Sequence, residues 1–238
     1  MKTVLVTGGA RGIGEAVVRR FIKDGWQVAF SYFHSEEKAQ TLAMETGALA
    51  YQADLRDTAQ THDMLQAAMK QLSHLDALIL NAGVTWQGLL TQMPLETYDD
   101  LMALNLRSAF VLARAVLPGM VQQGSGSLVF ISSIQGLAGA SCEAAYSASK
   151  AGLIGMAQAL SREVGPSGVR VNCLAPGVID TDMMAGYTQA ERDTLRLDTP
   201  LQRFGKADDV AAAVSFLCGP DAGFITGQVL GVDGGLRL

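Results

Sequence analysis

The sequence predicts an α/β fold in which one parallel sheet is covered by helices on both faces. Short apolar, β-branched runs alternate along the chain with segments of helical length. Several runs are apolar almost throughout, which is typical of strands buried on both faces of a parallel sheet. Helical crossovers between parallel strands are right-handed, so this alternation predicts a doubly wound sheet.

Each expected strand is a short apolar run bounded by polar residues or glycine. The strands are expected at residues 3–7, 27–31, 49–52, 77–80, 127–131, 170–174 and 229–232. The expected helices are 13–24, 35–45, 58–72, 98–123, 145–164 and 206–218. No linker, low-complexity tract or internal repeat interrupts this order, which predicts a single domain over residues 1–238. Its cofactor-binding half extends to about residue 130, and the catalytic and substrate-binding half covers about 131–238.

Composition and charge exclude several classes of protein. The 238 residues are 49% hydrophobic and 17% charged, which supports a large core and excludes a disordered chain. With a net charge of −5 and no run of lysines or arginines, we expect no nucleic-acid partner. The apolar stretches are strand-sized and too short to cross a bilayer, so we expect no membrane association.

The chain passes from Met1 into an apolar strand, without room for a signal or transit sequence, and a cytoplasmic location is expected. Cys142, Cys173 and Cys218 form neither a disulfide framework nor a zinc-type pair, which fits a reducing compartment. The three histidines lack ligand spacing, so we expect surface histidines and no metal.

A glycine-rich segment, residues 7–14, follows the first expected strand and opens directly into a helix. Gly8 permits a tight turn, Gly12 lets the backbone approach a phosphate, and Gly14 allows close packing of helix on strand. The helix, from Ile13 onward, offers free N–H groups and a positive dipole end to a pyrophosphate. A tight strand-to-helix connection needs no ligand, but this position before an amphipathic helix favours a dinucleotide site.

The end of the second strand indicates which dinucleotide binds. NAD-dependent enzymes usually carry Asp or Glu there to hold the ribose hydroxyls, whereas Ser31 to Ser35 contains no carboxylate. Arg11, inside the glycine loop, presents forked donors that suit a 2′-phosphate. We therefore expect NADPH rather than NADH; the alternative is that Arg11 is only a solvated loop residue.

Polar and small residues follow two further strands. Asp54, next to Leu55 after the third strand, is placed to accept a hydrogen bond from the adenine amino group. Asn81, Ala82 and Gly83 follow the fourth strand, where the backbone must pass close to a cofactor. Either segment taken alone could be a turn, but on successive strand ends they predict one cofactor groove of a Rossmann-type fold.

The reactive residues follow the fifth strand. Ser133 ends that strand, and Tyr146 and Lys150 share one face of the next long helix at i and i+4. A free phenol has a pKa of about 10, and the ammonium of Lys150 is expected to lower the pKa of Tyr146. Ser133 is expected to hold a carbonyl oxygen while hydride arrives from the nicotinamide. The set predicts a reductase that converts a ketone into a secondary alcohol, with Tyr146 as the proton donor.

With these motifs the whole chain resembles the classical short-chain dehydrogenase/reductases. The matching residues are Thr7 to Gly14, Asn81 to Gly83, Ser133, Tyr146, Lys150, Pro176-Gly177 and the terminal Asp233-Gly234-Gly235. The resemblance implies that Asn105 completes the catalytic set by holding a water near Lys150, and that the protein is a homotetramer. The cofactor contacts that it implies beyond the glycine loop are Tyr146, Lys150, Pro176, Gly177, Ile179 and Thr181.

The chain also resembles the 3-oxoacyl carrier-protein reductases of fatty acid synthesis. This resemblance implies that the substrate is a 3-oxoacyl thioester and that the partner is an acyl carrier protein. Those enzymes usually carry basic residues at the rim of the site to dock the acidic carrier protein. Residues 122–127 and 165–168, which match that rim, are uncharged here.

A second resemblance lies in the substrate loop. Residues 139–150 and 175–183 resemble the elongation factor P 5-aminopentanone reductases of Gram-positive bacteria, which reduce a ketone carried on a lysine of that translation factor. Glu143 fits a primary ammonium at the substrate mouth, or it is a helix-start glutamate favoured by the dipole. The tryptophan that typically follows the catalytic serine in that group is Gln135 here. Trp86 lines the cleft or belongs to the core.

Residues between Thr181 and Pro200 are expected to form a mobile helical lid over the substrate, to which Met183 contributes. A third reading, from another class, is a non-catalytic regulator that senses NADP(H). That reading predicts the loss of at least one of Asn105, Ser133, Tyr146 or Lys150, and all of them are present.

Overall fold

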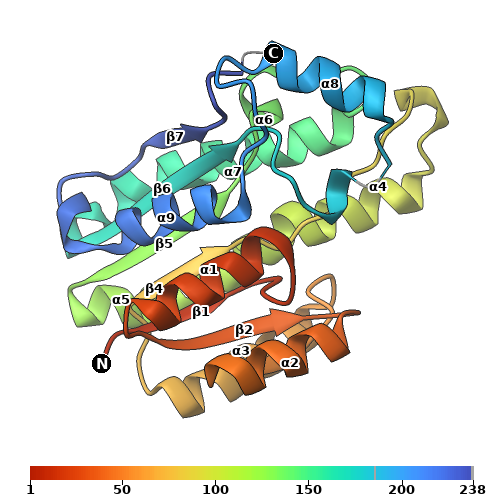
Figure 1. Cartoon of the computed structure of the whole chain (residues 1–238). Helices are drawn as coiled ribbons and strands as arrows, with labels where there is room; N and C mark the ends of the chain where they lie inside the picture. Colours follow the sequence, from red (N-terminus) through yellow and green to blue (C-terminus); the bar gives the residue numbers. More distant parts are fainter. Residues whose placement is uncertain (185, 237–238) are drawn as a thin grey trace.

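In the computed structural model, which describes residues 1–184 and 186–236 (of Met183 the backbone only), seven parallel strands form one sheet (Figure 1). The strands are β1 Thr3–Val6, β2 Gln27–Tyr32, β3 Leu49–Gln52, β4 Ala77–Leu80, β5 Gly126–Ile131, β6 Val169–Pro176 and β7 Val229–Val232. Their order is β3-β2-β1-β4-β5-β6-β7. The order reverses between β1 and β4, the switch point at which such sheets bind ligands. The doubly wound parallel sheet predicted from the sequence is therefore confirmed.

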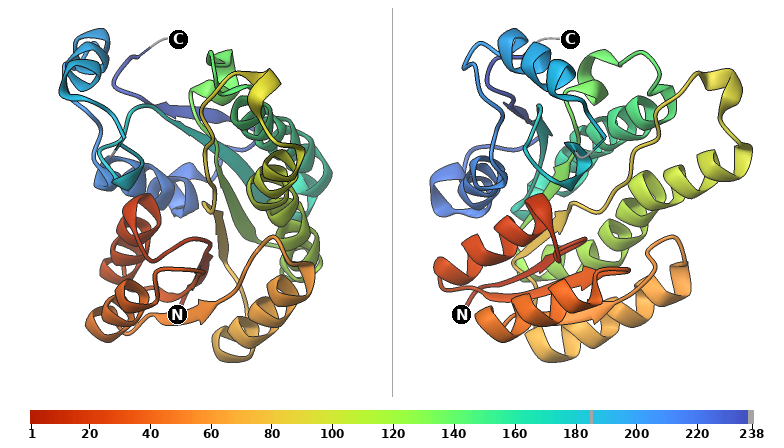
Figure 2. Two further views of the ribbon diagram at one scale, coloured as in Figure 1. Left: turned by 90° about the vertical axis from the view of Figure 1, so that its right-hand side faces the viewer. Right: turned by 45° about the vertical axis from the view of Figure 1, so that its right-hand side comes forward.

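Helices cover both faces of the sheet (Figure 2). They are α1 Gly12–Lys23, α2 Glu36–Thr46, α3 Thr58–Leu72, α4 Leu95–Met102, α5 Ser108–Gln123, α6 Gln135–Ala138, α7 Ala144–Val164, α8 Gln189–Asp198 and α9 Ala207–Cys218. Helices α1, α2 and α9 share one apolar core, and α3, α5 and α7 share the other. Successive β1 residues alternate between these cores: Val4 and Val6 join the first, and Leu5 the second.

The helix expected at 98–123 differs in detail. It begins at Leu95, directly after Pro94, and a π-helical segment, Ala103–Arg107, separates α4 from α5. The lid between Thr181 and Pro200 is helical, as expected, and contains α8 and a 3₁₀ turn, Asp182–Met184. No described residue of α8 is buried, and a capping box between Thr188 and Glu191 starts this helix.

Helix α4, the π-helical segment and α5 together form one helical rod, Leu95–Gln123. The expectation that every apolar stretch is strand-sized is wrong for this rod. Among the described residues, one stretch, Leu95–Gln123, is long and apolar enough by length and composition to span a membrane, with a mean hydropathy of 1.4. Its most apolar window is 39% buried within the protein. The α5 part packs on α3, α7 and β5, as the core helix of a globular protein does.

Candidate active site

The carboxyl ends of β1 and β4 are joined by Thr7 and Asn81. Thr7 Oγ1 accepts hydrogen bonds from the backbone N–H groups of Asn81 (2.9 Å) and Ala82 (3.0 Å). The Asn81 side-chain amide donates to the carbonyl oxygens of Thr7 (2.9 Å) and Gly8 (3.2 Å). These bonds hold the glycine loop against the end of β4, so two segments expected to line one groove lie together at the switch point.

The glycine loop requires glycine at Gly14 for lack of space and favours it at Gly12 for its backbone conformation. A Cβ atom on Gly14 would lie 2.0 Å from the carbonyl oxygen of Gly8, and Gly12 has a φ of 56°. A Cβ atom on Gly12 would lie 3.5 Å from Thr181 Cγ2, so the loop faces the segment after β6. No side chain among the described residues caps α1 at Arg11. Its first N–H groups are available to a phosphate, and the cradle fits a dinucleotide.

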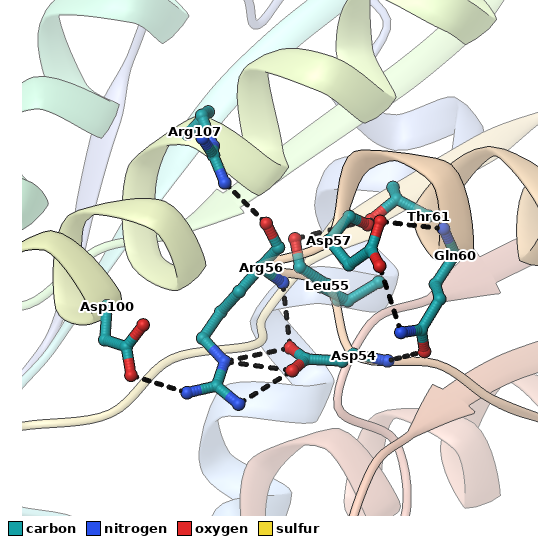
Figure 3. A network of polar contacts seen from close by, with 8 residues as sticks. All are labelled: Asp54, Leu55, Arg56, Asp57, Gln60, Thr61, Asp100 and Arg107. Carbon is teal, nitrogen blue, oxygen red and sulfur yellow. Dashed lines mark hydrogen bonds and ion pairs between the residues drawn. The ribbon is translucent and has the colours of Figure 1, made fainter.

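Asp54 belongs to a network of charged side chains after β3 (Figure 3). Arg56 donates to both carboxylate oxygens, with Nε 3.0 Å from Oδ1 and Nη2 2.7 Å from Oδ2. Arg56 also pairs with Asp100 of α4 at 2.6 Å, and Arg107 donates to the Arg56 carbonyl. Hydrogen bonds from Arg56 hold the pKa of Asp54 below its usual value. The intervening Leu55 is buried in the core.

Ser133, Tyr146 and Lys150 meet beyond the end of β5. Lys150 is only 4% exposed; its Nζ donates to the carbonyl oxygen of Ile131 at 2.9 Å and lies 5.6 Å from the centroid of the Tyr146 ring. Ser133 is buried, and its hydroxyl acts to lower the pKa of the Tyr146 phenol, so the two side chains lie near each other. Ser132 Oγ donates to the Lys150 carbonyl at 2.8 Å, which fixes α7 to the strand.

Burial dominates the ionisation of this pair. Burial raises the pKa of Tyr146 to about 12, helped by the nearby Glu143 carboxylate and opposed by the Ser133 hydrogen bond. Burial lowers the pKa of Lys150 to about 8. The expectation that Lys150 lowers the pKa of Tyr146 is therefore wrong for this structure. The reason is geometric: the ammonium donates to Ile131 rather than to the phenol oxygen, so desolvation outweighs its attraction.

Asn105 reaches the same point from the π-helical segment. Its Oδ1 accepts from the Val84 N–H at 2.9 Å, and its Nδ2 donates to the Val84 carbonyl at 2.8 Å and to Ser149 Oγ at 3.1 Å. A Cβ atom on Gly83 would lie 3.2 Å from both Asn105 Oδ1 and Lys150 Nζ. Gly83 is therefore the position at which Asn105 and Lys150 approach each other, and π-helical turns recur at functional sites.

The segment after β6 forms the opposite side. Ile134 N–H donates to the Pro176 carbonyl at 3.0 Å, which links this segment to Ser133. A Cβ atom on Gly177 would lie 2.8 Å from the Asp233 Cα, so Gly177 is required for packing against the C-terminal segment. Ile179 is buried.

The substrate side contains a buried carboxylate. Glu143 precedes α7, but its side chain does not cap the helix. Instead Glu143 Oε1 accepts from Thr85 Oγ1 at 2.9 Å, and Oε2 accepts from Gln135 Nε2. Gln135 Oε1 is buried and has no hydrogen-bond partner in the described part of the chain. Burial raises the pKa of Tyr187, and the nearby Glu143 carboxylate raises it further.

Two further substrate residues were expected from the sequence. Trp86 is half-buried, and a Cβ atom on Gly88 would lie 2.6 Å from its indole. The side chain of Met183 lies outside the described residues.

Sequence reasoning missed Arg56, Thr85, Ser149 and Tyr187. Ser149 lies between the two singled-out residues of α7, and Arg56 stands two residues after Asp54, which were the available signals. Thr85 and Tyr187 have no signal in the sequence, because long-range contacts alone bring them to Glu143.

Comparisons with known proteins cover almost the whole chain. A family model described as enoyl-(acyl carrier protein) reductase matches residues 8–237. The 3-oxoacyl-[acyl-carrier-protein] reductase of Staphylococcus aureus is 36% identical over 242 residues, which cover 100% of this chain and 98% of the relative. The enzyme of the same name from Chlamydia trachomatis is 38% identical over 240 residues, covering 99% and 97%.

Among solved structures, a blue fluorescent protein from a metagenomic library, in complex with NADPH, is 37% identical with a TM-score of 0.91. The match covers 100% of this chain and 98% of that protein.

Proposed function

The chain belongs to the short-chain dehydrogenase/reductase family, and on that premise we propose that it is an NADPH-dependent reductase that converts the ketone of a 3-oxoacyl thioester into a secondary alcohol. The observation that carries the proposal is the meeting of Ser133, Tyr146 and Lys150 beside the cradle of the glycine loop.

Reduction of a carbonyl, rather than of a carbon–carbon double bond, is supported in two ways. The relatives quoted above match this chain over almost their full length and are named 3-oxoacyl reductases, although the family model is described as an enoyl reductase. A hydroxyl and a phenol together also suit an oxygen that gains negative charge as it is reduced, because both can donate hydrogen bonds to it.

The chain's own residues supply binding and proton transfer. When bound, NADPH supplies the hydride that adds to the carbonyl carbon. Ser133 holds the carbonyl oxygen, and Tyr146, whose pKa of about 12 keeps the phenol protonated, donates its proton to that oxygen. Lys150, with a pKa of about 8, is mostly charged at neutral pH and returns a proton to Tyr146. We assign to Asn105 the ordering of a water that resupplies Lys150.

The cofactor preference is supported by the groove and by a relative. Thr181 lies against the glycine loop, and Arg11 stands at the N-terminus of α1. The end of β2, where NAD-dependent enzymes usually carry a carboxylate, has none. The solved blue fluorescent protein that resembles the chain holds NADPH. Asp54 and the segment from Asn81 to Gly83 are proposed to line the adenine and ribose parts of the groove.

The test is NADPH oxidation with acetoacetyl thioesters of coenzyme A and of acyl carrier protein. The control is Tyr146→Phe, which retains the ring and loses the proton. Turnover on carrier protein that disappears in Tyr146→Phe supports the proposal. NADPH binding without turnover of either thioester contradicts it. Activity unchanged in Tyr146→Phe would instead refute the assigned proton donor.

A second candidate substrate is an aminoketone carried on a lysine of elongation factor P. The observation that favours it is Glu143, which is buried and belongs to none of the ion pairs among the described residues. The orphaned Gln135 Oε1 lies beside it. Buried charges are normally paired, so a primary ammonium on the substrate would satisfy both acceptors. An aminoketone reduced faster than the thioesters, with the advantage lost in Glu143→Gln, would establish this candidate.

We also propose a cytoplasmic homotetramer. The three cysteines are free, which fits a reducing compartment. An open groove of about 770 Å³ lies between the rod of α4 and α5 and helix α7, and Phe110 stands in it with 55% of its surface exposed. Met102, Leu106 and Met156 line the same groove. Asp99 and Arg107 also line the groove, so a second copy of the chain would cover a face that is apolar in part and carries one charge of each sign.

A further inference from the structure

Two charged side chains flank Tyr146 on the same helix. Glu143 directly precedes α7, and Tyr146 and Lys150 follow it by three and seven residues, a spacing that puts all three on one face. Lys150 Nζ lies 5.6 Å from the centroid of the Tyr146 ring, but it donates its hydrogen bond to the Ile131 carbonyl. Burial raises the pKa of Tyr146, and the Glu143 carboxylate raises it further. Along this face the phenol therefore stands between a carboxylate and an ammonium.

Glu143 is also connected to Ser133, the other residue proposed to hold the substrate oxygen. Glu143 Oε2 accepts a hydrogen bond from Gln135 Nε2, and the backbone N–H of Gln135 donates to Ser133 Oγ at 3.2 Å. Gln135 therefore contacts both Glu143 and Ser133. The carboxylate is thus close to both hydroxyl groups that would meet the carbonyl oxygen of a ketone.

The charge of Glu143 has no counter-ion among the described residues. Glu143 is only 8% exposed, and both of its hydrogen-bond donors, Thr85 Oγ1 at 2.9 Å and Gln135 Nε2, are neutral. It belongs to no ion pair that the described part of the chain forms. Tyr187 of the lid, the other titratable group that it affects, is a phenol. Buried charges are normally paired, so this carboxylate fits a cation that arrives with a ligand.

Ketone reduction places a second negative charge near this carboxylate. The Tyr146 O–H bond breaks, its proton passes to the carbonyl oxygen, and its electron pair stays on the phenol oxygen until Lys150 returns a proton. Like charges repel more strongly in a protein interior than in water, so Glu143 raises the energy of this step. A cation beside Glu143 cancels the repulsion, whereas a neutral group leaves it in place.

Resting on the ketone reductase function proposed above, we propose that Glu143 is a specificity-determining residue that acts through Tyr146. Its charge slows proton donation to an uncharged ketone, and an ammonium group on the substrate removes that opposition by pairing with Glu143. The preferred substrates are therefore ketones that carry an ammonium group on the same molecule. This selection differs from ordinary binding of a cation, because it changes kcat as well as KM.

The test compares two esters of the same ketone: acetoacetylcholine, which carries a quaternary ammonium, and 3,3-dimethylbutyl acetoacetate, in which a carbon replaces the nitrogen. NADPH oxidation gives kcat and KM for each ester. In the unmodified protein, kcat is expected to be about threefold higher for the cationic ester, the change that about half a pKa unit of the proton donor implies. Glu143→Gln, which keeps the shape and removes the charge, is expected to raise kcat for the uncharged ester and to abolish the difference. The matched control is Glu163→Gln, an exposed glutamate in the last turn of α7.

A fall of kcat for both esters alike in Glu143→Gln gives Glu143 a structural role and overturns the proposal. A preference for the cationic ester that is confined to KM also overturns it, because Glu143 then only binds the ammonium. The two proposals fail separately. A protein that reduces the uncharged ester with the same kcat in Glu143→Gln refutes this inference alone, whereas a protein that reduces neither ester nor an acetoacetyl thioester refutes the proposed function itself.

Discussion

At the scale of single residues, the proposed supply of protons depends on the amine of Lys150. Burial lowers its pKa to about 8 and raises the pKa of Tyr146 to about 12. At neutral pH the phenol is protonated and Lys150 is mostly charged, so both act as acids in the direction of ketone reduction. The order of these two pKa values supports the proposal that Tyr146 donates to the substrate and that Lys150 replaces its proton.

The rate of ketone reduction at saturating NADPH is therefore expected to fall as the pH rises through about 8. Above that value Lys150 loses the proton that it passes to Tyr146, whereas the phenol itself stays protonated. The measurement is kcat across the pH range around that value. A kcat that stays constant there, or that rises with pH, contradicts the assigned role of Lys150.

Gly83 is expected to tolerate no side chain. In Gly83→Ala the added Cβ atom would lie 3.2 Å from both Asn105 Oδ1 and Lys150 Nζ, which pushes the two groups apart. We expect kcat to fall, but by less than the roughly 10²-fold that a misplacement of about 1 Å costs, because the neighbours need to move by only a few tenths of an ångström. The control is Gly119→Ala in α5, where the added atom meets nothing within 4 Å. Gly83→Ala with the kinetics of the control would show that this contact is unimportant.

At the scale of elements, the π-helical segment Ala103–Arg107 carries Asn105 and is anchored from outside the helix. Arg56 binds Asp100 in α4, and Arg107 donates back to the Arg56 carbonyl (Figure 3). The same guanidinium orients Asp54. Through Arg56, the loop after β3 therefore links Asp54, the expected adenine contact, to the helical residues before and after Asn105.

Arg56→Gln is expected to lower the free energy of unfolding by about 1 kcal/mol, a modest figure because the side chain is partly exposed. It should also weaken NADPH binding, since Asp54 loses the donors that orient it. Urea denaturation and a fluorescence titration measure the two effects. Arg114→Gln, an exposed arginine of α5, is the control. If Arg56→Gln loses no more stability or NADPH affinity than Arg114→Gln does, Arg56 neither anchors the π-helical segment nor orients Asp54.

The strands could be predicted to within two residues, because burial on both faces makes the central strands β1, β4, β5 and β6 nearly continuous apolar runs. The run at 77–80 coincides with β4. Helix α8 could not be bounded in the same way, since it buries no described residue and only its capping box marks its start.

The candidate site was predictable where chemistry depends on local spacing, as for Tyr146 and Lys150. It was not predictable where long-range packing decides the outcome. Burial, which the i and i+4 spacing does not reveal, reversed the expected pKa shift of Tyr146. Thr85 meets Glu143 only because the loop after β4 folds against the start of α7.

At the scale of the whole molecule, the exposed apolar surface of the rod of α4 and α5 is the main feature that a single copy leaves unexplained. One side of the rod packs on the sheet, while Phe110 and its neighbours face the groove beside α7. The homotetramer proposed above would bury this groove, and such burial would explain the apolar character of the helix.

Phe110→Glu is expected to convert the tetramer into smaller species, because a charge cannot be buried unpaired at the centre of an apolar interface. Size-exclusion chromatography with light scattering measures the mass of each variant. Met44→Glu, at an exposed position on α2, is the control and should leave the mass unchanged. A tetramer that survives Phe110→Glu places the interface elsewhere, and a monomeric unmodified protein contradicts the assembly itself.

The central claim is that Tyr146 and a bound nicotinamide reduce a ketone to an alcohol. It is tested most directly by following deuterium from 4-deuterated NADPH into the product of an acetoacetyl thioester by mass spectrometry, in the unmodified protein and in Tyr146→Phe. We expect one deuterium on the carbon that bears the new hydroxyl group, and almost no product from Tyr146→Phe. Deuterium at any other position of the product, or full deuterium transfer in Tyr146→Phe, would contradict the account.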